Sequence, residues 1–376
     1  MKRAFVGSFS THAMSINDNY MSQAGFYFQR KLIRLAHPSE IIWIHPINLF
    51  KTRYSYKYLR RISRQLRNRV AFMLFRIIIS GLPPHFLQIF HQLTLKIPDS
   101  KNIWLYNSEL NNIFYVFRLF VHKKNIYIVL ADTSTTGVHS LVTKIGLFLC
   151  KSYISLSKSG LELNPAKCPK LAHGIAEPSF RSIEDVQSNQ DKQAKYLIDY
   201  LVSQQSNSLI VYSGSIGPST GLDLVLDTAP NLRDVTILVT GKPYYISYHQ
   251  LKSRIESTPN VIYLGMLSFS TYQYLLSNAA LALSLREPKP EHSFNFPSKI
   301  IEYLSYGLPV ITTIDYNLAT PPLFYCNKFS PKALEKSILL ALNYCNSSLA
   351  DLAIDYSKKF SPAAFLSLIE EIELRS

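Results

Sequence analysis

The sequence is poor in cysteine and glycine and contains no Asp-x-Asp pair. Its four cysteines lie far apart without a Cys-x-x-Cys spacing, so neither a disulfide framework nor a zinc site is indicated, and a reducing cytoplasm fits. Thirteen glycines exclude a collagen-like or glycine-rich low-complexity chain. No pair of aspartates is spaced to hold a divalent ion, and we expect neither a metal nor a cofactor.

Acidic residues are scarce in the first 150 positions, which hold 20 Lys/Arg but only 5 Asp/Glu, whereas the remainder holds 20 of each. The net charge of +15 therefore lies wholly in the first half. This asymmetry indicates an anionic partner, either a membrane surface, a nucleic acid or a phosphate-bearing substrate. A long apolar run is also missing. The stretch 70–79 contains Arg76 and ends before Gly81-Leu82-Pro83-Pro84, so no transmembrane span is predicted.

What the sequence does contain is enough apolar material for large cores, since hydrophobic residues make up 47% and charged residues 17%. The length suggests two domains. Short β-branched runs alternate with helix-length segments, which predicts parallel sheets with helices on both faces and ligands at the carboxyl ends of the strands. The expected strands are 3–6, 40–44, 102–106, 125–130, 151–156, 209–212, 235–239, 261–264, 280–285 and 309–312. The expected helices are 25–36, 140–149, 222–229, 245–257, 268–278, 298–306, 331–345 and 361–374.

A basic segment stands out in the first half. Residues 51–69 contain eight Lys/Arg, and five of these are spaced 4, 3, 4 and 3 so that they form one helical stripe: Arg53, Lys57, Arg60, Arg64 and Arg67. Apolar residues form another face, as an anchor at a membrane interface requires. Two alternatives stay open. One is an ordinary solvated helix, and the other is nucleic-acid binding, although no recognised nucleic-acid motif accompanies the segment.

Three loops in the second half follow consecutive strands and open on the same edge of the predicted sheet. They span 214–221, 240–243 and 264–267, and the first is rich in glycine and enters a helix. Glycines let backbone N–H groups approach an anion, and a helix N-terminus adds a partial positive charge. The loops therefore indicate a phosphate-binding edge.

The most specific stretch runs from Arg286 to Ile311, where a polar loop follows a strand and leads into a helix that Gly307 ends before the next strand. Ser298 and Glu302 lie four residues apart near the start of that helix, on one face. A carboxylate there can hold a vicinal diol, while the free N–H groups hold phosphate.

The residues Pro297-Ser298-Lys299-Ile300-Ile301-Glu302-Tyr303 and Gly307-Leu308-Pro309-Val310-Ile311 carry a resemblance. They resemble the nucleotide-sugar signature of family-4-type retaining glycosyltransferases with the two-domain GT-B fold. The variant PSK-x-x-EY-x-x-x-G-x-PVI is that of bacterial surface-polysaccharide enzymes. The resemblance covers about 210–315 well, 170–175 fairly and the rest weakly.

The resemblance implies roles for particular residues. Glu302 matches the glutamate that binds the donor ribose hydroxyls, and Ser298 and Lys299 lie where diphosphate or sugar contacts are expected. The phosphate-side loop is matched by Gly214, Ser215 and Gly217, and the turn against the nucleotide base by Gly265, Met266 and Leu267. The family is metal-independent, in agreement with the missing Asp-x-Asp pair.

The sequence also departs from the family pattern. Where many members carry Arg and Lys in the phosphate-side loop, this chain has Ser215 and Thr220. Lys242, Lys289, Lys299 and helix dipoles are the substitutes that can neutralise a departing diphosphate. The paired-glutamate spacing also fails, because Phe294 stands eight residues before Glu302. Glu287, Glu291 and His292 stay open for the first acid's role, and Glu291 is included among the candidate catalytic residues.

Signals in the first half are fewer. Glu109 and Asp132 follow expected strands and can orient an acceptor hydroxyl or the donor sugar, so they join Glu291 as candidate catalytic residues, although a surface role is open for both. His139 and His173 are undecided between proton transfer and a structural role.

The sequence thus predicts an α/β fold of two Rossmann-like domains (GT-B) facing each other across a cleft. The predicted divisions are an acceptor-side domain at 1–180 with a basic amphipathic segment at 51–98, a linker and surface helix at 181–207, a nucleotide-sugar domain at 208–355, and a C-terminal helix at 356–376 packing back on the first domain. The predicted activity is that of a retaining hexosyltransferase (EC 2.4). It would take a UDP- or GDP-sugar and a saccharide or polyprenyl-diphosphate-saccharide acceptor, at an anionic membrane surface on the cytoplasmic side, with no nucleic acid. A catalytically weak nucleotide-sugar-binding scaffold is the first alternative, and a nucleic-acid-binding protein is the second.

Overall fold

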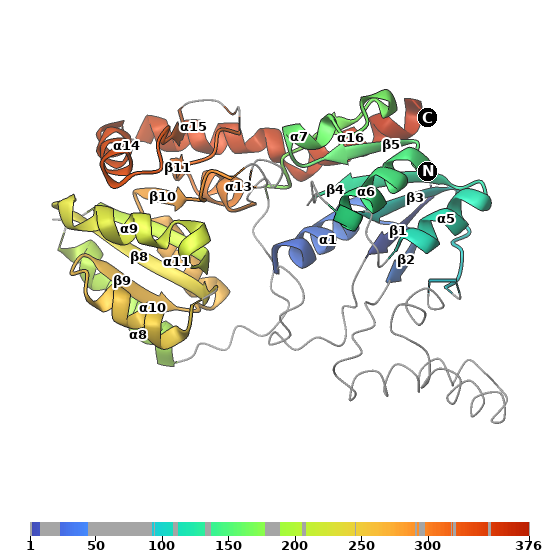
Figure 1. Ribbon diagram of the computed structural model, residues 1–376. Coiled ribbons are helices and arrows are strands. Elements are labelled where there is room, and N and C mark those ends of the chain that lie inside the picture. The colour runs from blue at the N-terminus through green and yellow to red at the C-terminus, as the bar shows by residue number, and fades with distance from the viewer. Residues whose placement is uncertain are drawn as a thin grey trace, which may run out of the picture. The chain divides into compact units, whose positions relative to one another are not determined.

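A computed structural model describes residues 2–7, 23–43, 92–93, 95–107, 112–131, 137–176, 189–204, 208–244, 246–289, 292, 298–316, 318, 321–344 and 347–375. The chain divides into two compact units. Unit 1 consists of Met1–Ser155, Gly160–Lys170 and Glu370–Ser376, and unit 2 of Leu156–Ser159 and Leu171–Ile369. Each unit is built on one six-stranded sheet (Figure 1).

The sheet of unit 1 has the strand order β2-β1-β3-β4-β5-β6. Neighbouring strands from β2 to β5 pair in parallel. The strands are β1 (Arg3–Gly7), β2 (Glu40–Trp43), β3 (Asn102–Tyr106), β4 (Asn125–Leu130), β5 (Ser152–Ser155) and β6 (Lys170–Leu171). The five longer ones correspond to strands expected from β-branched and aromatic runs, whereas β6 is too short to leave such a pattern.

Helices α5 (Ile113–Val121) and α6 (Gly137–Leu149) contact each other and cover one face of this sheet (Figure 1). Their buried residues Tyr115, Leu119 and Leu147 join strand residues in one apolar core. On β3 and β4, Trp104 and Tyr127 stack with ring centroids 4.9 Å apart. The remaining helical elements of the unit are α1 (Gln23–Ala36), the end of α7 (Lys158–Leu161), and the 3₁₀ turn η1 (Pro165–Lys167).

A buried ion pair holds the end of the last helix, α16 (Pro362–Arg375), on the sheet of unit 1. The Glu373 carboxylate accepts hydrogen bonds from Arg3 Nε at 2.9 and 3.0 Å and from Trp104 Nε1 at 2.8 Å. The Glu373 side chain is fully buried, and that of Arg3 is 12% exposed. These three contacts offset the free-energy cost of burying the carboxylate charge.

Replacing Glu373 with glutamine is expected to destabilise unit 1, because Arg3 would keep its charge in a buried place without its buried counter-charge. Loss of one partner of a buried pair costs about 3 kcal/mol. Calorimetric melting of the full chain measures the effect as a lower midpoint for unit 1. Glu370→Gln is the matched control, since Glu370 lies 3.7 Å from the same arginine with its side chain 53% exposed. An equal effect of both substitutions would contradict the role of burial.

The sheet of unit 2 has the order β12-β11-β10-β7-β8-β9, and all its pairs are parallel. The strands are β7 (Ser208–Ile216), β8 (Val235–Pro243), β9 (Val261–Gly265), β10 (Leu281–Ser284), β11 (Val310–Thr312) and β12 (Leu323–Tyr325). Only β12, three residues long, was not expected from the sequence pattern.

Helices cover both faces of this sheet, and alternate strand residues enter two separate cores (Figure 1). Ile210 and Tyr212 face α9 (Leu222–Thr228), α10 (Tyr248–Glu256) and α14 (Pro331–Tyr344), whereas Leu209 and Val211 face the other helices. These others are α8 (Asn189–Ser203), α11 (Phe269–Asn278), α13 (Ser298–Ser305) and α15 (Ser347–Ser357). The 3₁₀ turns η2 (Pro218–Thr220), η3 (Ala229–Asn231) and η4 (Lys358–Phe360) complete the unit.

The predicted fold class is confirmed, since each unit has a parallel sheet with interspersed helices. Within the described part of the chain, no helix taken singly has the length and apolar character to cross a bilayer, and one sharply bent pair, Pro331–Tyr344 with Ser348–Arg375, satisfies these measures.

Candidate functional site

The sheet of unit 2 reverses its strand order between β7 and β10, because β7 is followed by β8 on one side while β10 lies on the other. Ligands of open parallel sheets bind outside the carboxyl ends of the strands at such a point. Here the loops after β7 and β10 contact each other: Glu287 N donates to Ser219 O at 3.2 Å. A Cβ added to Gly221 would lie 2.7 Å from Leu285 Cβ, so this close approach requires glycine.

Two glycines shape the end of β7 and its neighbour β8. Gly214 and Gly241 are paired in register and have φ angles of +124° and +139°. A Cβ on Gly241 would lie 1.9 Å from Gly214 O, so Gly241 lets the two backbones come together. No described atom lies within 4 Å of a Cβ built on Gly214, which leaves its backbone open to a ligand.

The rest of the predicted phosphate-side loop is held by its own hydrogen bonds. Gly217 N donates to Thr220 Oγ1 at 2.9 Å, and the Tyr212 hydroxyl lies 2.6 Å from Thr220 O. A Cβ on Gly217 would lie 2.0 Å from Tyr244 O. Gly217 and Thr220 therefore fix the shape of the loop, while Gly214 and the exposed Ser215 form its accessible part.

Glu302 lies on α13, the helix that precedes β11. Because this helix runs antiparallel to the strands, its first turn lies at the carboxyl edge of the sheet. Glu302 Oε2 accepts a hydrogen bond from Lys299 Nζ at 2.7 Å and lies 3.5 Å from the Tyr272 hydroxyl. Among the described residues, Oε1 has no hydrogen-bond partner. The side chain is 11% exposed. One carboxylate oxygen is thus held in place, and the other is available to accept from a ligand hydroxyl.

A chain of hydroxyl groups connects Glu302 to the end of β7. Tyr272 contacts Ser213 Oγ at 3.0 Å, and Ser213 Oγ contacts the Tyr303 hydroxyl at 2.7 Å. Burial, with the charge of Glu302 second, raises the pKa of Tyr272 well above its usual value. The phenol therefore stays neutral, and Lys299 is the group that balances the charge of Glu302, with its Nζ 4.4 Å from the centre of the Tyr272 ring.

In the turn after β9, the three residues predicted to lie against the base have different environments. Gly265 has a φ of +71°, and a Cβ there would lie 1.9 Å from Gln190 Nε2, which donates to Leu264 O. Leu267 is buried in the core, whereas the Met266 side chain is 40% exposed. Of the turn predicted to lie against a base, Met266 alone presents a side chain to solvent.

Cationic residues stand at the carboxyl ends of both strands that pair with β7. Lys242, exposed at the end of β8, is paired in register with Ser215. Arg286, half-buried beyond the end of β10, was missed by the sequence reasoning. Burial raises the pKa of Tyr212 and of Tyr316, and the charge of Arg286 opposes this effect in both. Thr313 fixes the Arg286 backbone through hydrogen bonds at 2.6 and 2.8 Å.

Other predicted residues lie away from this arrangement. Ser298 begins α13 and is exposed, and Lys289 pairs with Glu287 at 2.8 Å. His173 Nδ1 lies 3.3 Å from Leu156 O, and the ring packs on Phe360, which indicates a structural role. Among the described residues, no three His, Cys, Asp or Glu gather to hold a metal ion. Glu109, Asp132 and Glu291, with Arg53, Lys57, Arg60, Arg64 and Arg67, lie outside the described residues.

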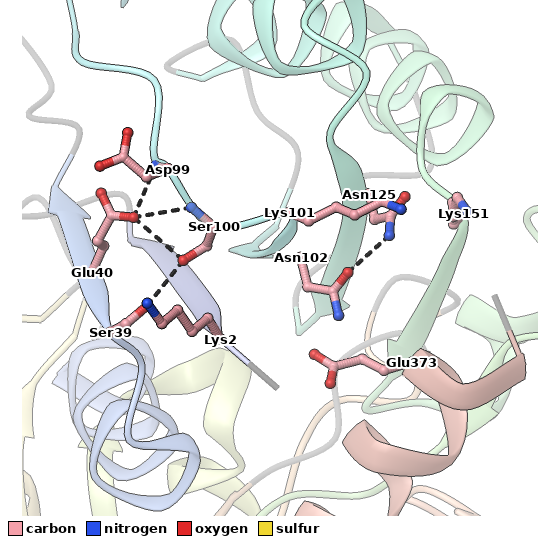
Figure 2. A pocket seen from close by; sticks show the side chains of 10 residues that line it. All are labelled: Lys2, Ser39, Glu40, Asp99, Ser100, Lys101, Asn102, Asn125, Lys151 and Glu373. Atoms are coloured by element: carbon pink, nitrogen blue, oxygen red, sulfur yellow. Dashed lines mark hydrogen bonds between the residues drawn. The ribbon is translucent and has the colours of Figure 1, made fainter.

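A cavity of about 730 Å³ lies at the amino ends of the strands of unit 1, not at a carboxyl edge. Figure 2 shows its polar wall, where Glu40 accepts from Ser100 N and Asp99 N, and Asn125 donates to Asn102. Buried Glu373 also lines it. The polar groups shown in Figure 2 are hydrogen-bonded to one another. None of the residues predicted to bind the nucleotide sugar lines the cavity.

Residues 207–323 match the protein family described as glycosyl transferases group 1. The match contains the loops after β7, β8 and β9 and the whole of α13. No curated protein matches the chain. The match supports a glycosyltransferase in the broad sense.

Solved structures show the same fold at low sequence identity. HepE of Anabaena in complex with UDP-glucose has 13% identity and a TM-score of 0.59, covering 100% of this chain and 99% of that one. The trehalose-6-phosphate phosphatase N-terminal domain of Candida albicans has 12% identity and a TM-score of 0.63, covering 98% and 97%. The UDP-GlcNAc 2-epimerase of Neisseria meningitidis bound to UDP-GlcNAc has 11% identity and a TM-score of 0.53, and the likeness covers 100% of both chains. Together with the two parallel sheets, these likenesses confirm the GT-B class of two Rossmann-like domains.

Proposed function

We propose that this protein is a retaining glycosyltransferase that takes a sugar from a nucleotide-sugar donor bound at the carboxyl edge of unit 2. The observation that carries the proposal is the Glu302 carboxylate, oriented through Oε2 by Lys299 and with Oε1 left for a ligand hydroxyl. A vicinal diol such as that of a ribose donates two hydrogen bonds, which a carboxylate accepts well.

The diphosphate of the donor would lie over Gly214 and Ser215, where the backbone is open. We assign its neutralisation to Arg286 and Lys242, which stand at the ends of the two strands that pair with β7 and replace the cations that the loop itself lacks. Positive groups fixed before the reaction stabilise the charge that develops on the departing nucleoside diphosphate. The Met266 side chain is the group placed to contact the base.

We assign the acceptor to a saccharide, carried by a polyprenyl diphosphate, in the synthesis of a bacterial surface polysaccharide at the inner face of the plasma membrane. The signature around Glu302 and the basic stripe at 53–67 support this assignment. The HepE, epimerase and S. aureus MnaA structures bind UDP or a UDP-sugar, which favours UDP as the donor nucleotide. No metal takes part in the proposed reaction.

A panel of donors tests the proposal most directly. We expect one of UDP-, GDP-, ADP- or CMP-linked sugars to raise the melting temperature of the purified chain, because a ligand selective for the folded state stabilises it by about 2.7 kcal/mol at 100 times its Kd. Free sugars at the same concentration serve as the control. If no nucleotide sugar gives a shift at millimolar concentration, the donor site is absent.

A nucleotide-sugar-binding scaffold without turnover is the second candidate. Thr220 stands where many glycosyltransferases carry a lysine, and its hydroxyl is hydrogen-bonded within the loop. The two candidates differ in one measurement. Release of the nucleoside diphosphate from the donor identified in the panel, with or without an acceptor, occurs only if the protein is an enzyme.

A further inference from the structure

Helix α5 exposes an apolar face to solvent. Its sequence Ile113–Val121 contains a single charged residue, Arg118, whose guanidinium donates to Gln92 O and Leu95 O. While Tyr115, Val116 and Leu119 enter the core, four large apolar side chains point away from it. These are Phe114, Phe117, Phe120 and Val121, and Phe117 is 56% exposed. A helix at a protein surface ordinarily carries polar residues on such a face.

Helix α6 continues the apolar surface, because it contacts α5 on the same face of the sheet (Figure 1). Its exposed side chains Val138, Leu141, Ile145 and Phe148 are spaced 3, 4 and 3, which places them in one row. Phe148 is 71% exposed. Two adjoining helices that both expose apolar rows form a patch of the kind that marks an interaction site. We call these eight side chains the α5–α6 patch.

Positive charge surrounds the α5–α6 patch. Lys167 Nζ lies 5.9 Å from the centre of the Phe148 ring, Lys144 is exposed on α6, and Lys123 is exposed just beyond α5. Between Asn112 and Lys167 the sequence holds seven Lys/Arg and two acids, Asp132 and Glu162. An apolar surface with a mostly cationic border matches a bilayer with anionic headgroups, which offers hydrocarbon inside a negative surface.

The charge argues against a second copy of the chain as the occupant. In a symmetric pair of chains this face would meet its own copy and bring lysines against lysines. We propose that the α5–α6 patch is the surface by which the protein lies on an anionic bilayer. The proposal rests on the membrane association proposed above and assigns it a surface distinct from the basic stripe.

Vesicle binding by the full chain tests this surface. The double variant Phe117→Ser with Phe148→Ser removes two exposed rings and leaves the core intact, so it should fold. We expect partition onto vesicles of phosphatidylcholine with 30% phosphatidylglycerol to fall by about tenfold or more, given the free energy of burying one phenylalanine. Tyr196→Ser with Tyr200→Ser is the matched control on α8, since both tyrosines are as exposed, and it should leave partition unchanged.

A second variant reports on depth directly. The Phe148→Trp fluorophore should shift to shorter wavelength on anionic vesicles and be quenched by brominated acyl chains. Unchanged partition of the Phe117/Phe148 variant would overturn the proposal, as would failure of the unaltered chain to partition onto these vesicles. So would light scattering that shows a dimer dissolved by the same substitutions. Donor-induced stabilisation is measured on every variant, so that failure of the donor site is seen separately from failure of this surface.

Discussion

Replacing Glu302 with alanine is expected to weaken donor binding by about 100-fold, because two hydrogen bonds from a diol to a charged acceptor are lost together. The loss should be the same for the nucleoside diphosphate and for the nucleoside alone, since both contain the ribose. Isothermal titration with the nucleotide identified in the donor panel measures both affinities. The transfer rate at low donor concentration should fall in proportion.

The ion pair of Glu302 with Lys299 requires a control, because its loss alone can change unit 2. Glu256→Ala removes a comparable helical pair, with Lys252 at 3.5 Å, on exposed α10. We expect that variant to bind the donor normally. If Glu302→Ala keeps full donor affinity while its melting temperature equals that of the unaltered chain, the carboxylate does not hold the ribose and the proposed donor site is wrong.

Periodicity predicted most of the fold, since the expected strands 209–212, 235–239 and 261–264 are rich in β-branched residues and are closely followed by a glycine. The strands it missed, β6 and β12, have two and three residues, and their pairing depends on neighbours distant in sequence. Helices α5 and α15 were not expected either. The stretch 181–207 was predicted to be a linker with a polar surface helix, and the structure has α8 at Asn189–Ser203. The structure shows that its Ala194 and Ile198 enter the core of unit 2, a contact that its many polar residues conceal.

The candidate site was predictable to the extent that it follows strand ends. Glu302, Lys299 and Gly214 were chosen from spacing and resemblance, and the structure brings Glu302 and Lys299 into contact. Tyr272 and Ser213 were not chosen, because hydroxyl contacts between separate elements leave no mark in a local pattern. Similarly, sequence order did not show that Thr220 is used inside its own loop, nor that Arg286 ends a strand adjacent to β7.

Replacing Arg286 with glutamine is expected to lower the efficiency of transfer by about 100-fold, the usual effect of removing one preorganised group that stabilises a departing anion. Affinity should fall for the nucleoside diphosphate and stay the same for the nucleoside, which carries no phosphate. Arg286→Lys should recover part of the loss, because it keeps the charge but not the two-pronged geometry of the guanidinium. Titration and initial-rate measurements on the three proteins test this.

The selective response expected of Arg286→Gln separates a donor site from a general loss of structure. Damage to unit 2 would weaken nucleoside and nucleoside diphosphate binding together in both variants, whereas the arrangement described here confines the effect of Arg286 to phosphate. Lys328→Gln is a suitable control, since this lysine is exposed in the same unit beyond β12. Equal losses of nucleoside and nucleoside diphosphate affinity in Arg286→Gln would show that the guanidinium supports the loops after β7 and β10 instead of binding the diphosphate.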